Sequence, residues 1–429
     1  MKRLLLRQVH IVDPNSPYHD TTCDVLIAGT QIERIANHID TTADFTVQES
    51  GLCVSPGWMD IGAQVGEPGY EHRETIQSFA AAAVAGGFTA VAPFGNTDPV
   101  IDDINGIQYW KNAFASTPVE VYPLAALSQN MQGEGLTEFY ELYDAGAVGF
   151  SDALRPIDDD RLLMLALQYA KDLNAVVFDF PCRLDLLPGG MTHEGAISVR
   201  LGLTGIPAQA ESIRVSRDIE LCKYTRGKCM LYGISTQRSV ELIARAKEEH
   251  LPICAAVPVW NLIYTDETLL GLDAMWKILP PLRSETDRAT LLEAVTTGII
   301  DVVTSNHTPL EIEAKQSPFP SASFGAIGIQ TCFSLLYECV QNHWTLDEII
   351  RLMCIRPREV LGIDPPSLRE GTRAELTLFN PTKSWLFDHS TNASLSRNSP
   401  LFGRTLQGKV LGVVNKGMLA LAHQEPVRL

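Results

Sequence analysis

Short apolar runs alternate with amphipathic helical segments through most of this 429-residue chain, and this alternation restricts the possible folds most strongly. The pattern holds from about Cys53 to Gly362, with strand-like runs such as Thr89–Pro93 and helical segments such as 75–85. A repeat of strand and helix over this length predicts an α/β fold with a parallel sheet, and for this many units a TIM-type (β/α)8 barrel. Functional side chains of such a barrel lie at the C-terminal ends of its strands.

Both ends of the chain have a different pattern, because they contain short strand-like segments separated by turn residues. These segments are Leu4–Val12, a hairpin of Val25–Ala28 with Ile32–Ile35, Ala374–Phe379, Thr405–Val410 and Val413–Ala420. We expect the two ends to pair with each other, since chain termini often meet at a domain surface. The predicted organisation is a composite β-sandwich domain from residues 1–53 and 366–429, and a barrel domain from residues 54–365.

Charge and cysteine content exclude several kinds of partner. The chain has 34 Lys and Arg against 51 Asp and Glu, a formal charge of −17, which argues against nucleic acid or an anionic membrane as a partner. A membrane span is not expected, because no run of 18 apolar residues occurs. The nine cysteines form no Cys-x-x-Cys pair. Cysteines spaced in this way are typical of reduced thiols, and they predict a cytoplasmic location.

A series of short motifs follows the barrel pattern in order. They are PGWMD at 56–60, EPG at 67–69, GGFT at 86–89, NTDP at 96–99, GFSD at 149–152, DFPC at 179–182, YGIST at 232–236, LPPLR at 279–283 and SNHTP at 305–309. Together they resemble the dihydroorotase family of cyclic amidohydrolases, whose members close and open the dihydroorotate ring in pyrimidine biosynthesis. The resemblance runs along nearly the whole chain, and it also implies the barrel fold.

The resemblance implies a metal site whose ligand positions are changed in this chain. Metal-binding histidines are expected at four positions that hold Gly62, Gln64, Phe180 and Gly233, and the general-base position holds Asn306. Asp152 stands at the position of a bridging ligand. A metal hydrolase needs His or carboxylate ligands, and an amide cannot accept the proton of the attacking water. We therefore expect no complete catalytic set and no cofactor, with zinc bound only if an atypical site exists.

Two retained residues are candidates for substrate binding, Asn96 and His307. Asn96 also suits a turn, and His307 also suits a buried histidine whose hydrogen bonds are satisfied. Gly66 replaces an arginine that the resemblance implies for a substrate carboxylate. Other polar residues are interpreted as structural or solvated, namely Arg283 paired with an acidic neighbour, and His19, His72, His193, His250 and His343.

The bulky residues Phe180 and Tyr232 accompany Gly62 and Gly233. This pattern predicts an exchange of side-chain volume that keeps the barrel mouth packed, or alternatively a reshaped ligand pocket.

Three hypotheses for function follow from these residues and the resemblance. The first is a catalytically inactive dihydroorotase-like protein that serves as a structural partner of aspartate transcarbamoylase, because the resemblance includes non-catalytic members of that kind. The second is an active cyclic amidohydrolase with an atypical or single-metal site, held by Asp152 and His307. The third is a small-molecule sensor. The resemblance also implies a homo-oligomer of at least two copies.

Overall fold

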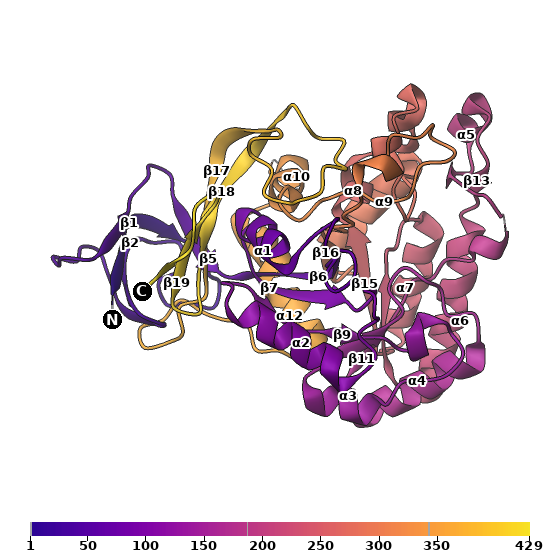
Figure 1. Ribbon diagram of the computed structural model, residues 1–429, viewed down its shortest axis with the longest axis horizontal. Helices are drawn as coiled ribbons and strands as arrows, with labels where there is room; N and C mark the ends of the chain where they lie inside the picture. The colour runs from indigo at the N-terminus through magenta and orange to yellow at the C-terminus, as the bar shows by residue number, and fades with distance from the viewer. Residues whose placement is uncertain (1, 187, 342–343) are drawn as a thin grey trace.

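The computed structural model describes residues 2–186, 188–341 and 344–429, and it contains the expected α/β barrel (Figure 1). Neighbouring barrel strands are parallel, in the order β16-β15-β14-β11-β10-β9-β7-β6, and β8 (Glu120–Val121) pairs with β7. The strands are β6 (Trp58–Gln64), β7 (Phe88–Phe94), β9 (Leu124–Ala125), β10 (Gly149–Ser151), β11 (Val176–Asp179), β14 (Lys228–Tyr232), β15 (Ile253–Pro258) and β16 (Val302–Thr304). The barrel is nearly closed, because the backbone N–H of Ser305 donates to Asp60 Oδ1 of β6 over 2.8 Å.

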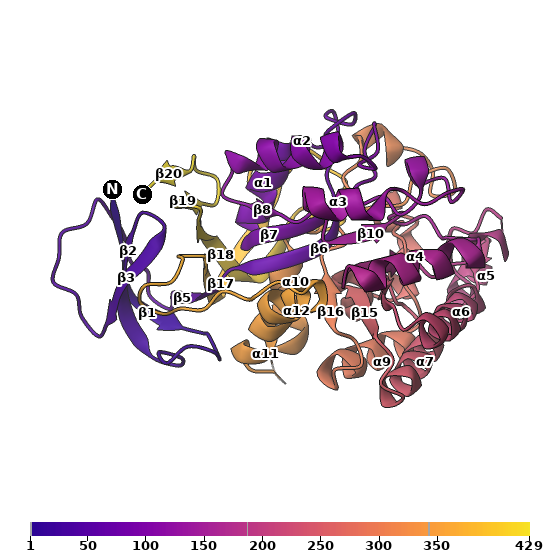
Figure 2. The same cartoon turned by 90° about the horizontal axis from the view of Figure 1, so that it is seen from below.

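Helices cover the outside of the barrel (Figure 2). They are α1 (Ile76–Ala85), α2 (Ile104–Ala115), α3 (Phe139–Ala145), α4 (Asp160–Asp172), α5 (Ala196–Leu201), α6 (Gln209–Thr225), α7 (Gln237–Glu248), α8 (Val259–Ile263), α9 (Glu285–Thr296), α10 (Cys332–Val340), α11 (Leu346–Ile350) and α12 (Arg356–Leu361). Helix α1 begins where the sequence predicts, because Thr75 and Ser78 form a capping box. Helix α11 continues through a π-helical turn, Arg351–Ile355, into α12.

The two chain ends form one sheet beside the barrel, and both termini lie on this side of the molecule (Figure 1). Its order is β20-β19-β18-β17-β5-β1-β2-β3, with β4 paired to β1. The strands are β1 (Arg3–Ile11), β2 (Thr22–Ala28), β3 (Gln31–Ala36), β4 (Phe45–Val47), β5 (Cys53–Pro56), β17 (Leu376–Phe387), β18 (Arg404–Asn415), β19 (Met418–Leu421) and β20 (Val427–Arg428). A small separate pair is β12 (Thr192–His193) with β13 (Gly205–Ile206).

One expected strand boundary is wrong. The sequence predicts a break between Val410 and Val413, but β18 continues through Gly412. The turn into β19 lies at Lys416 and Gly417, which both adopt positive φ. Gly412 instead allows β18 and β19 to approach closely, because a Cβ at this position would lie 2.1 Å from the carbonyl oxygen of Ala420.

A buried ion pair joins the barrel to the sheet. Arg358 of α12 donates to Glu375 Oε1 over 2.5 Å and to the carbonyl of Gly57 over 2.8 Å. Thr89 Oγ1 of β7 donates to the same Glu375 oxygen over 2.8 Å. These bonds fix the sheet against the base of the barrel, away from the strand ends where a site is expected.

Among the described residues no helix is both long and apolar enough to cross a bilayer. All nine cysteines are free, and seven of them are buried. His343 lies outside the described residues.

Candidate functional site

The centre of the barrel mouth is filled by aromatic side chains. Gly62, near the end of β6, has φ +81°, and a Cβ there would lie 2.4 Å from a ring carbon of Tyr232. Gly233, after β14, has φ +80°, and its Cβ would lie 3.1 Å from the ring of Phe180. Tyr232 packs edge-on against Phe94, with ring centroids 4.9 Å apart. The glycines therefore make room for the aromatic rings, which is the exchange of volume expected from the sequence.

Amide side chains connect β6 to its neighbours at this end of the barrel. Gln64 Oε1 accepts from Asn96 Nδ2 over 3.1 Å, and Gln64 Nε2 donates to Thr308 Oγ1 over 3.4 Å. Asn306, after β16, has φ +48° and donates from Nδ2 to the carbonyl of Leu279 over 3.1 Å. The Oδ1 atom of Asn96 is buried without a hydrogen-bond partner among the described residues. It is therefore an acceptor available to a ligand.

Asp152 follows β10 and binds the loop after β9. Its Oδ1 accepts the backbone N–H groups of Leu127 and Ser128 over 3.0 and 2.9 Å, and its Oδ2 accepts the hydroxyl of Ser128. Burial is the largest influence on this carboxyl group and raises its pKa, although these hydrogen bonds oppose the shift. The hydroxyl of Tyr232 donates toward the carbonyl of Gly62 at 3.4 Å.

His307 is buried beneath α1. Its Nδ1 accepts the backbone N–H of Gly328 over 3.2 Å, and its Nε2 lies 3.5 Å from Glu74 Oε2. The imidazole also packs against Phe79, with ring centroids 5.7 Å apart. The structure thus places His307 and Asn96 in different surroundings, and His307 has the environment of a core histidine.

These residues do not fit a metal centre. The positions implied for histidine ligands hold Gly62, Gln64, Phe180 and Gly233, and a side chain at position 62 would meet the Tyr232 ring. Within the described ranges, the structure contains no group of three or more His, Cys, Asp or Glu side chains that could hold a metal ion. Asp152 accepts three hydrogen bonds from the loop after β9, whereas His307 is buried beneath α1 beside Glu74, so the two side chains do not form a common ligand set.

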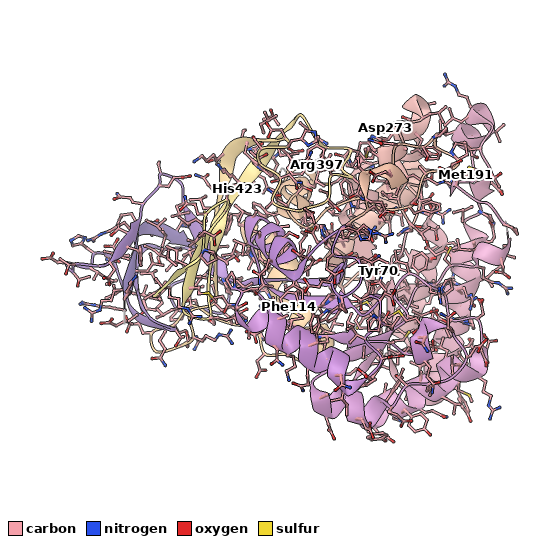
Figure 3. The ribbon with its side chains drawn as sticks, in the orientation of Figure 1. Tyr70, Phe114, Met191, Asp273, Arg397 and His423 are labelled. Carbon is pink, nitrogen blue, oxygen red and sulfur yellow. The ribbon has the colours of Figure 1, made fainter. Side chains whose placement is uncertain are left out.

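A cavity of about 580 Å³ lies to one side of the filled centre. It opens over the C-terminal ends of β7, β9 and β10, and its polar lining includes Tyr70, Asn96, Asp98, Asn130, Asp152 and Arg155. Tyr70 is labelled in Figure 3, where His423 marks the opposite, sheet side of the molecule. The cavity thus combines an unpaired amide oxygen, a buried carboxyl group and a guanidinium group.

Three residues of the cavity lining, Tyr70, Asn130 and Arg155, are not among the candidates expected from the sequence. Asn130 has φ +52° in the loop after β9, and Arg155 is three residues after Asp152. Neither belongs to a motif. The rule that functional groups follow barrel strands could have indicated both.

Other polar residues hold the barrel mouth together. Arg283 is buried, donating to Ser235 Oγ over 3.0 Å and to the Ile206 carbonyl over 2.8 Å, with Glu211 at 3.9 Å. His193 is half-buried with Nδ1 at 3.3 Å from Arg283, rather than solvated as expected. Burial, with a smaller influence from Arg283, lowers the pKa of His193 to about 4. His72 is exposed.

Two buried lysines hold the segment after β16 onto the preceding loop. Lys315 Nζ donates to the carbonyls of Ala274, Lys277 and Ser323 over 2.8–3.0 Å. Lys277 Nζ donates in return to the carbonyls of Phe319 and Pro320 over 3.0 and 2.9 Å. This reciprocal arrangement anchors the segment on the side of the mouth away from the cavity lining.

Known proteins resemble the chain over its full length. A protein of Syntrophus aciditrophicus named dihydroorotase is 34% identical, covering 97% of this chain and 99% of the relative. A dihydroorotase of Pelotomaculum thermopropionicum is 37% identical, with 95% of each covered. This chain belongs to the dihydroorotase family. A family model described as "Dihydro-orotase-like" matches residues 51–239.

A solved structure shares the fold. The L-hydantoinase (dihydropyrimidinase) of Arthrobacter aurescens superposes with a TM-score of 0.86 at 21% identity, covering 100% of this chain and 98% of that structure. The full-length relatives are named as enzymes. The expectation of a catalytically inactive structural partner is therefore wrong, and the alternative of a cyclic amidohydrolase is favoured.

Proposed function

We propose that this chain hydrolyses a cyclic amide or ureide in the cavity beside the barrel axis. The observation that carries the proposal is the buried Oδ1 of Asn96, which lacks a partner among the described residues and lines the cavity. A buried acceptor without a hydrogen bond costs about 1–3 kcal/mol, so a ligand N–H group that reaches it is bound favourably. A ring amide supplies such a group, and relatives named dihydroorotase support this class of substrate.

The carboxyl group of Asp152 is the acid–base group of this proposal. Because burial raises its pKa, it can hold or release a proton closer to neutral pH than an exposed aspartate can. Water adds its hydroxyl to the ring carbonyl carbon, and its proton passes to Asp152. The ring C–N bond then breaks, and the proton is returned to the departing nitrogen. The reverse sequence closes the ring with loss of water.

Turnover by metal-depleted and zinc-supplemented protein tests the proposal. We expect both samples to hydrolyse dihydroorotate or the neutral rings dihydrouracil and hydantoin, measured by chromatography. Asn96→Ala should lower kcat/KM by roughly tenfold or more, corresponding to loss of one hydrogen bond to a buried acceptor. Asp152→Asn should lower kcat by about 100-fold or more.

A matched control is Asn105→Ala, an exposed asparagine on α2 that lies outside the cavity lining. It should retain wild-type turnover. Absence of turnover of all three rings by both samples would refute the proposal. Turnover by the zinc sample alone would refute the metal-independent chemistry. The expected homo-oligomer, the transcarbamoylase contact and the cytoplasmic location stay predictions.

A further inference from the structure

A second cavity, of about 610 Å³, lies on the sheet side of the molecule. Helix α1 forms one wall, and the C-terminal hairpin of β19 and β20 forms the other, as Figure 2 shows from below. We call it the hairpin cavity. It shares no lining residue with the cavity at the barrel mouth, and Figure 3 shows its His423 well apart from Tyr70 of that cavity. Its volume is typical of sites for small molecules, which measure about 300–1,000 Å³.

The floor of the hairpin cavity is apolar. Ala80 and Val84 come from α1, and Met418 and Ala420 come from β19, and all four are buried although they line the cavity. Leu419 packs into the core of the sheet, so its neighbours on β19 point to the opposite face, toward α1. A concave apolar floor of this kind favours a ligand with an apolar body.

Arg428 places a positive charge at the rim of the hairpin cavity. Val427 and Leu429 pack against the core of the sheet, and Arg428 between them points to the other face and lines the cavity. Among the described residues, no carboxylate lies within ion-pair distance of Arg428. Glu425, the acidic residue of the lining, is exposed. The guanidinium group is therefore available to a ligand.

His423 adds a polar group that is uncharged at neutral pH. It has φ +63° in the turn that leads from β19 to β20. Burial is the largest influence on this imidazole and lowers its pKa, and the nearby charge of Lys409 lowers the pKa further. A neutral imidazole can still donate one N–H group to an anion. Arg428 and Lys409 thus give this rim two positive charges against the one carboxylate of Glu425.

We propose that the hairpin cavity binds a small aromatic anion, with its ring on the floor between α1 and β19 and its anionic group paired with Arg428. A guanidinium forms charge-assisted hydrogen bonds with a carboxylate or a sulfonate, and these are stronger than bonds between neutral groups. A rigid ring also loses little conformational freedom on binding. The site is independent of the proposed hydrolysis, because the two cavities have separate linings.

Fluorescence titration of the full-length protein with 1-anilinonaphthalene-8-sulfonate tests this site, because the probe carries apolar rings and one sulfonate. We expect saturable binding of one probe per chain. Arg428→Gln should raise the Kd roughly tenfold or more through loss of the charge-assisted contact. Benzoate should displace the probe at a concentration roughly tenfold or more below that needed for benzamide, which has the same ring without the charge.

A second variant tests the position of the ring. Ala81 is exposed on α1 and lines the hairpin cavity, so Ala81→Trp should occupy the space and raise the Kd of the probe by roughly tenfold or more. The matched controls are Ala289→Trp on α9 and Arg161→Gln on α4, which are exposed positions outside the lining and should bind as wild type does. Thermal melting compares the folding of all variants, since substitutions of exposed residues usually change stability little.

The outcomes separate the parts of the proposal. Absence of saturable binding by wild type, or a Kd unchanged in both Arg428→Gln and Ala81→Trp, would overturn the site. Weaker binding in Ala81→Trp alone, or equal displacement by benzoate and benzamide, would overturn the role of Arg428. Turnover of cyclic amides has no bearing on these results, so this inference and the proposed function can fail separately.

Discussion

The contact between Gly62 and Tyr232 gives the sharpest prediction about the barrel mouth. Replacing Gly62 by alanine adds a Cβ at φ +81°, 2.4 Å from a carbon of the Tyr232 ring. The left-handed backbone costs about 1–2 kcal/mol for a residue other than glycine. Overpacking adds about 1–3 kcal/mol. We therefore expect Gly62→Ala to lower the free energy of unfolding by about 2–5 kcal/mol, a large part of the stability of a typical domain.

A double-mutant cycle separates the two contributions. Tyr232→Ala alone should cost about 3–5 kcal/mol, as for other buried aromatic side chains. In the double variant the overpacking disappears, so its loss should be smaller than the sum of the single losses by about 1–3 kcal/mol. Gly298→Ala is the matched control, because Gly298 has φ +75° with open space around its Cβ, and it should show the backbone cost alone.

Urea denaturation followed by tryptophan fluorescence measures the stability of the wild type and of the four variants, since Trp58, Trp110 and Trp260 are fully buried. Additivity of the two substitutions within about 0.5 kcal/mol would refute the steric argument. The central space of the barrel would then not depend on Tyr232, and the proposed displacement of the site to one side would lose its physical basis.

Two further predictions concern buried carboxylates. Burial raises the pKa of Asp60 to about 6 from 3.8 despite hydrogen bonds from Ser305, so the folded state holds a proton that the unfolded state releases between these values. The free energy of unfolding of wild type relative to Asp60→Asn should therefore fall by about 2 kcal/mol as pH rises from 4 to 7, and a flat difference in urea titrations would contradict this. Arg358→Leu should cost about 3–5 kcal/mol by leaving Glu375 buried without its partner. Adding Glu375→Gln should recover most of that loss, and a single-variant loss below about 1 kcal/mol would show that this pair does not hold the junction.

Local sequence patterns predicted the barrel elements well, because apolar periodicity and helix caps are properties of neighbouring residues. The Thr75 cap and the β7 run are examples. The error at Gly412 arose because glycine marks both turns and close strand contacts, and the sequence does not distinguish them. Its contact with Ala420 depends on how β18 and β19 pair.

The candidate site was harder to predict, because its properties depend on residues distant in sequence. The surroundings of His307 are set by Glu74, and the free oxygen of Asn96 depends on how Gln64 is oriented. Arg155 carries no motif at all. Its availability follows from an absent ion pair among the described residues, which a sequence cannot show.

The position of the cavity limits the chemistry that this barrel can perform. Aromatic rings from β7 and β14 and from the loop after β11 occupy the axis, so a ligand meets polar groups from β7, β9 and β10 on one side. Those groups supply an amide acceptor, one carboxyl group of raised pKa and one guanidinium, which suffice to orient a ring and to move one proton. Catalysis here would therefore depend mainly on orientation and a single acid–base group, so loss of Asp152 should reduce turnover more than loss of Asn96.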